Sequence, residues 1–157
     1  MQRLTDLEHG QIYRVSHPSV FGLVIELALT TGLKLLVCGN RLPFYEITYE
    51  LARRVGQQYE AIIKERLFFS RAETCIQLVD FLSEMHADAL PLLVTDMLAR
   101  FKDEDDGQVD ELFFACQVEL QRLSKETLVF VSTKTYPGLE RLEHVLVRIT
   151  HHLDDDR

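Results

Sequence analysis

Residues 33–58 read LKLLVCGNRLPFYEITYELARRVGQQ, and this stretch decides the expected fold class. Its first part, Leu33–Cys38, is an almost unbroken apolar run of strand length, which is typical of a strand buried on both faces. The part from Phe44 to Gln58 repeats apolar residues at four-residue steps: Ile47, Leu51 and Val55. That spacing predicts an amphipathic helix. A buried strand that leads straight into a helix predicts one unit of a parallel sheet.

The rest of the chain alternates between strand and helix patterns in the same way. Further strands are expected at Gln11–Val15, Leu67–Phe69, Pro91–Thr95, Leu128–Ser132 and Val145–Ile149. Helices are expected at Val20–Leu29, Ser70–Met85 and Glu111–Leu123, the second of them opened by a capping box of Ser70 and Glu73. This alternation predicts an α/β fold with three layers and a mainly parallel, doubly wound sheet.

Length and composition indicate one domain. The chain has 157 residues, 46% of them hydrophobic and 27% charged, and no internal repeat or low-complexity linker interrupts it. We therefore expect residues 1–157 to form a single domain with an acidic tail at 151–157, in which His151 and His152 belong to a frayed terminus.

No apolar stretch reaches the ~20 residues of a membrane span, so no membrane partner is expected. The three cysteines, Cys38, Cys75 and Cys116, are interpreted as buried thiols of a reducing, cytoplasmic compartment.

Charge limits the classes of partner. The chain carries 25 acids against 17 bases, a net charge of −8, which excludes a stand-alone nucleic-acid binder with a basic footprint. DNA contact is expected only through a partner or a local patch. The acidic runs at 103–106 and 154–156 are interpreted as solvated charge, and no metal site is predicted there or elsewhere.

The loop after Leu33–Cys38 is the expected ligand site, because ligands of open parallel sheets sit at the carboxyl ends of strands and helix N-termini attract phosphate. Residues 39–46, GNRLPFYE, have the length and position of the phosphate-binding loop G-x-x-x-x-G-K-[ST]. Only its first glycine, Gly39, is present. A later apolar strand ends in Asp96, at the place where such folds carry a Mg²⁺-binding acid.

These motifs resemble the ATPase domain of RecA-like recombinases. The segments that carry the resemblance are LKLLVCG before the loop, ELARR in the following helix, LFFSRAETCIQLVDFL, PLLVTD, and STKTYPG after LVFV. The resemblance covers about Gly10 to Ile149 in the order of elements and implies a RecA-like fold. It also implies that Gly39, Asn40, Arg41 and Asp96 occupy the positions of a vestigial nucleotide site.

The departures from that family oppose triphosphate binding. Phe44 stands where the loop needs its second glycine, Tyr45 where it needs lysine, and Glu46 where it needs a hydroxyl for Mg²⁺. No catalytic residue is therefore assigned, and neither ATP nor Mg²⁺ is expected as a cofactor. Two alternatives stay open: Arg41 clamping a phosphate in place of the lysine, and Asp96 binding Mg²⁺.

Two functions are compatible with this pattern. The first is a non-catalytic RecA-like module that acts as an accessory or assembly protein of DNA recombination or repair, binding a protein partner or another copy of itself. Exposed phenylalanines among Phe68, Phe69, Phe113 and Phe114 would supply its contact surface. The alternative is a nucleotide sensor or ATPase with an altered loop. A flavodoxin-like or receiver-like domain with chance similarity is a third reading, which strand order would test.

Overall fold

The computed structural model describes residues 4–39, 42–102, 104 and 106–153. Six parallel strands form one sheet in the order β3-β2-β4-β5-β1-β6. The strands are β1 (Ile12–Val15), β2 (Leu33–Val37), β3 (Leu67–Arg71), β4 (Leu92–Thr95), β5 (Val129–Ser132) and β6 (Thr150–His152). The expected α/β class and parallel sheet are confirmed, and the arrangement is consistent with a RecA-like one.

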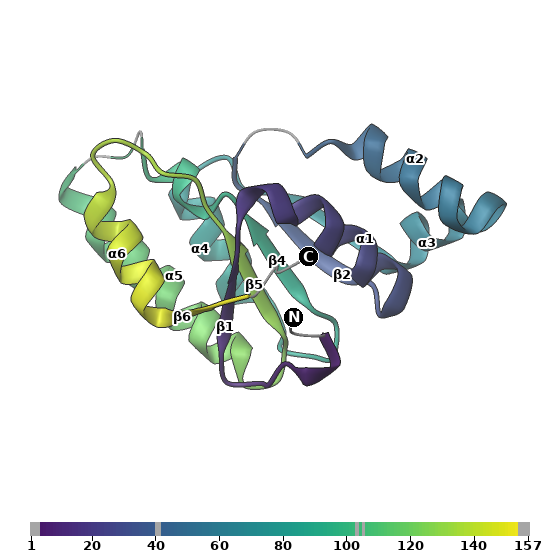
Figure 1. The fold of residues 1–157 in the computed structure, drawn as a ribbon. Coiled ribbons are helices and arrows are strands. Elements are labelled where there is room, and N and C mark those ends of the chain that lie inside the picture. Colours follow the sequence, from purple (N-terminus) through teal and green to yellow (C-terminus); the bar gives the residue numbers. More distant parts are fainter. Residues whose placement is uncertain (1–3, 40–41, 103, 105, 154–157) are drawn as a thin grey trace.

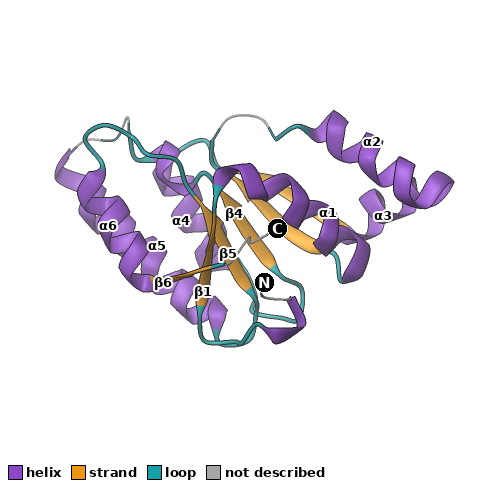
Figure 2. Cartoon of the chain, viewed as in Figure 1, coloured by secondary structure: helices purple, strands orange, loops and turns teal. Residues whose placement is uncertain are grey.

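Helices cover both faces of the sheet, as Figures 1 and 2 show. They are α1 (Val20–Thr30), α2 (Phe44–Val55), α3 (Tyr59–Arg66), α4 (Cys75–Glu84), α5 (Asp106–Ser124) and α6 (Glu140–Ile149). The first three lie on one face and the last three on the other. The chain winds from β1 toward β3 along one face and returns toward β6 along the other, which makes the sheet doubly wound.

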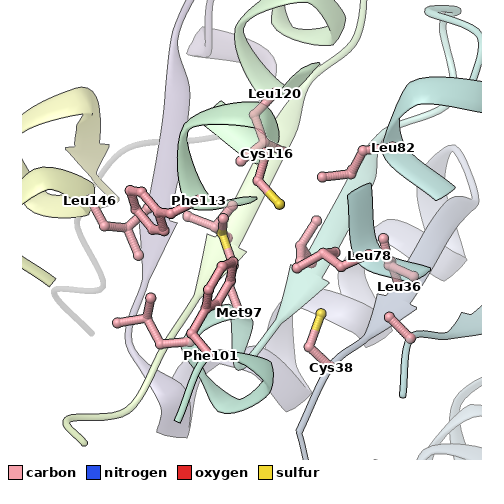
Figure 3. Packing of buried hydrophobic residues seen from close by; sticks show 14 of the residues in the cluster. Leu36, Cys38, Leu78, Leu82, Met97, Phe101, Phe113, Cys116, Leu120 and Leu146 are labelled. Carbon is pink, nitrogen blue, oxygen red and sulfur yellow. The ribbon is translucent and has the colours of Figure 1, made fainter. Parts of the chain in front are cut away.

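Two hydrophobic cores result, one on each face of the sheet. Leu36 lies in the core beneath α4, α5 and α6, whereas its neighbours Leu35 and Val37 lie in the core beneath α1, α2 and α3. Figure 3 shows the first of these cores, in which Cys38 and Cys116 are packed among apolar side chains. Alternation along strands buried on both faces explains why the sequence reads as unbroken apolar runs. Within the described residues, no helix is long and apolar enough to cross a bilayer.

The expected strand at Val145–Ile149 is wrong, because these residues complete helix α6. Leu142 and Leu146 are buried one turn apart, while Val147 is exposed. The alternation of Val145, Val147 and Ile149 was a local coincidence within a helical repeat that begins earlier, at Glu140. The true last strand is β6, which pairs with β1. His151 and His152 therefore belong to the sheet and not to a frayed end.

The start of helix α4 and the presence of helix α3 also differ from expectation. Helix α4 begins at Cys75 and is capped by Thr74, whose hydroxyl accepts a hydrogen bond from the N–H of Gln77 (3.0 Å), so the expected Ser70–Glu73 capping box is wrong. Thr74 is the extended residue directly before the helix, which is the capping position. Ser70 cannot cap the helix, because it still lies within β3. Helix α3 was not expected at all, because it is short and only Ile62 of its residues is buried.

Candidate functional site at the carboxyl edge of the sheet

A cavity of about 250 Å³ lies where strands β1, β4 and β5 end. These strand ends form the upper edge of the sheet in Figure 1. The connections after β1 and β5 leave toward opposite faces, so the cavity sits beside a topological switch point. Its lining comes from the β1–α1 turn, helix α1, the start of α2 and the ends of β4 and β5: His17, Val20, Phe21, Val24, Leu42, Pro43, Ile47, Thr95, Asp96 and Lys134.

Asp96 is the buried acid of this site. It follows β4 directly, is 4% exposed, and adopts a left-handed backbone with φ 54° and ψ 52°. Among the described residues it is the one non-glycine with positive φ. Its N–H donates a hydrogen bond to the Ser132 hydroxyl at the end of β5 (2.9 Å). The left-handed turn costs about 1 kcal/mol or more, and such strain is often found at functional sites.

Tyr136 covers the Asp96 carboxylate. Its hydroxyl lies 2.8 Å from Oδ1 and 2.7 Å from Oδ2 and donates a shared hydrogen bond to the two oxygens. Burial, followed by this hydrogen bond, raises the pKa of Tyr136 well above its ordinary value, so the phenol stays neutral. The contact ties the β5–α6 loop to the end of β4, and the Lys102 ammonium lies 5.5 Å from the centre of the Tyr136 ring.

Gly39, just after β2, leaves the space that the Asp96 side chain occupies. A methyl group on Gly39 would overlap Asp96 Oδ2 and lie 2.6 Å from both its Cβ and Cγ. The strand ends are held together by the Cys38 N–H, which donates to the Thr95 carbonyl (3.0 Å). A side chain at position 39 would therefore push β2 and β4 apart, so glycine is required by close approach and not by an unusual φ.

Two strand-to-helix turns border the cavity, and their described residues lack the lysine of a phosphate-binding loop. The β1–α1 turn, Ser16-His17-Pro18-Ser19, contains no glycine or lysine, and Pro18 has no N–H to offer. In the loop after β2, Asn40 and Arg41 lie outside the described residues. At the start of α2, Tyr45 is 81% exposed and Phe44 44% exposed.

Cys38 lies directly beside this site but is not reactive. Burial raises the pKa of its thiol to about 12, with Arg100 acting in the opposite direction and Asp96 adding to the rise. A thiolate is the nucleophilic form of cysteine, so Cys38 is inert at neutral pH. Within the described part of the chain, no three His, Cys, Asp or Glu side chains are grouped so that they would hold a metal ion.

The structure brings together Gly39 and Asp96, two of the four positions singled out from the sequence. Sequence reasoning missed Tyr136 and Ser132, which hold Asp96, and the contribution of Lys134 to the cavity. The segment STKTYPG had been singled out only as part of the family resemblance, and no periodicity signals that Tyr136 reaches across to β4. The chain matches no protein-family model, and no curated protein sequence matches it. The site's own chemistry therefore carries the functional argument.

Proposed function

We propose that this chain is a non-catalytic RecA-like module that serves as an assembly protein, in the recombination or repair setting that the family resemblance implies. The observation that carries the proposal is the contact between Tyr136 and Asp96. A P-loop ATPase needs the acid at this strand end for its Mg²⁺ ion. Here both carboxylate oxygens share one hydrogen bond from a neutral hydroxyl, which a Mg²⁺ ion bound to both oxygens would have to displace.

The surroundings of Asp96 also disfavour a triphosphate. Such a ligand needs successive backbone N–H groups and a lysine, and the turn at Ser16–Ser19 lacks both the glycines and the cation. The cavity, with a volume of about 250 Å³, is at the small end of small-molecule sites, and apolar residues make up most of its lining. These features support a role other than ATP hydrolysis.

The edge strand β3 supports the assembly role. It pairs with β2 alone, and its side chains Phe68 and Phe69 are 51% and 50% exposed on opposite faces of the sheet. Phe114, on α5, is also exposed, whereas Phe113 belongs to the core. An edge strand with exposed aromatic residues is a template for strand addition by a partner chain, which would cover both phenylalanines.

The test is thermal unfolding with and without Mg²⁺-ATP and Mg²⁺-ADP, combined with sedimentation to measure assembly. A ligand at ~100 times its Kd adds ~2.7 kcal/mol to the stability of the folded state, so binding would be visible as a higher midpoint. We expect no shift with either nucleotide. We expect assembly with itself or with a partner, and loss of that assembly when Phe68 and Phe69 are both replaced by lysine.

The alternative function, a nucleotide sensor, is favoured by the presence of Asp96 and Lys134 in one cavity. A nucleotide-dependent rise in midpoint that disappears in Asp96→Asn, but not in the control Asp110→Asn, would establish the sensor and overturn the proposal. Asp110 is a suitable control because it is exposed and pairs with Arg141 at 3.0 Å, away from the cavity.

A further inference from the structure

The cavity at the carboxyl edge is lined by apolar residues, which we name the wall, and by polar residues, which we name the floor. The wall comes from helix α1, with Val20, Phe21 and Val24, and from the segment that leads into α2, with Leu42 and Ile47. The floor consists of the side chains at the strand ends, which are polar: His17, Thr95, Asp96 and Lys134. A largely apolar cleft with a few convergent polar groups is the usual form of a small-molecule site.

The two charges of the floor are opposite and are not neutralised by each other. Among the described residues, Lys134 forms no ion pair with any acid, and so none with Asp96. The Asp96 oxygens share one hydrogen bond from Tyr136, and an ionised carboxylate has about four acceptor sites. Both groups therefore retain the capacity to bind a ligand of opposite charge.

Size and wall chemistry restrict that ligand further. A volume of about 250 Å³ favours a molecule smaller than a nucleotide. The wall residues offer van der Waals contact to an aliphatic or aromatic group, and a purely anionic molecule would meet the Asp96 carboxylate at close range. A molecule with one positive group, one negative group and an apolar body satisfies every surface of the cavity.

We infer that this cavity binds a small apolar zwitterion, of the chemical class of the branched-chain and aromatic α-amino acids. The ammonium group binds the Asp96 carboxylate, the ligand carboxylate binds the Lys134 ammonium, and the apolar side chain packs against α1 and the start of α2. This site goes beyond the proposed assembly role and does not depend on it.

The experiment is a titration of the whole chain with L-leucine, followed by calorimetry or by amide chemical shifts. A ligand of this size is expected to bind with a Kd of about 1 mM or tighter. Three analogues each lack one feature: 4-methylpentanoate has no ammonium, 3-methylbutylamine has no carboxylate, and glycine has no apolar body. We expect each to bind at least about tenfold more weakly than leucine, because each loses one class of contact.

Lys134→Met is the informative variant, because it keeps the aliphatic stem and removes the charge. We expect it to weaken leucine binding about tenfold while 3-methylbutylamine binds as before. The control Lys64→Met, on the exposed side of α3, should bind leucine like the parent chain. Any of three results would overturn the inference. They are no binding of leucine at concentrations tens of times the expected Kd, equal binding of leucine and glycine, and unchanged leucine binding in Lys134→Met. Nucleotide titrations test the proposed function separately, so the two can fail independently.

Discussion

Asp96 combines an unusual backbone conformation, close packing and a buried hydrogen bond. It turns the chain with a left-handed conformation, accepts the Tyr136 hydroxyl, and fills the space that Gly39 leaves open. Asparagine and aspartate tolerate such a conformation better than other side chains, so the turn itself does not require glycine. Because the carboxylate is buried, the hydrogen bond that it accepts from Tyr136 offsets part of the cost of removing it from water.

The Gly39→Ala substitution tests this arrangement. The added methyl group would overlap the Asp96 side chain, so we expect the free energy of unfolding to fall by about 1–3 kcal/mol in urea denaturation. In an Asp96→Gly background the overlapping atoms are gone, and the cost of Gly39→Ala should then be smaller by at least ~1 kcal/mol. Equal costs in the two backgrounds would show that position 39 is constrained by something other than Asp96.

At the scale of elements, helix α6 shows that the pattern of five residues can predict the wrong secondary structure. Residues 145–149 read VLVRI, in which apolar residues alternate with others as in a strand. The longer window from Glu140 places Leu142 and Leu146 on one face, and that face packs into the core beneath α4–α6. The segment is helical because burial of Leu142 and Leu146 against the sheet outweighs the local preference of residues 145–149 for a strand, which amounts to about 1 kcal/mol at most.

A pair of alanine substitutions distinguishes helix from strand at this place. In the helix, Leu146 is fully buried and Val147 is 46% exposed. Leu146→Ala should therefore lower the free energy of unfolding by about 2–5 kcal/mol, and Val147→Ala should change it by no more than about 0.5 kcal/mol. A strand with Val145, Val147 and Ile149 facing the core would give the opposite order. Chemical denaturation monitored by circular dichroism measures both values.

At the scale of the whole molecule, the folded chain keeps three thiols buried. Cys38, Cys75 and Cys116 are free cysteines far apart in the sequence, and all three lie in the core beneath α4–α6. Burial raises the pKa of each above the ordinary value of 9.0, to about 12 for Cys38. Cys75 also donates an S–H hydrogen bond to the Arg100 carbonyl (2.8 Å), and after burial the Glu104 carboxylate adds to the rise of its pKa.

This burial predicts a loss of stability at high pH. Well below pH 9 the thiols are protonated in both states and contribute no pH dependence. Above pH 9 the unfolded thiols ionise while the folded ones keep their protons, so the free energy of unfolding falls as pH rises, by up to roughly 1.4 kcal/mol per pH unit for each thiol. Urea denaturation between pH 7 and pH 10.5 measures the slope, and Cys38→Ala should reduce it. A flat profile would contradict thiol burial.

Much of the fold was determined by the sequence alone. Apolar runs of strand length, such as Leu33–Val37 and Val129–Ser132, required strands buried on both faces, and their alternation with amphipathic helices left a doubly wound parallel sheet as the solution. The same patterns located the carboxyl edge of the sheet, because strand ends are marked by the change from apolar to polar residues at Gly39 and Asp96.

Strand order and the contents of the site were decided only by the tertiary structure. Periodicity is a local property, whereas the contact of Tyr136 with Asp96 joins residues 40 positions apart and depends on β4 and β5 being neighbours. The same holds for β6, whose three residues become a strand only because β1 offers an open edge. Local patterns determine which segments bury their faces, and packing determines which of those segments meet.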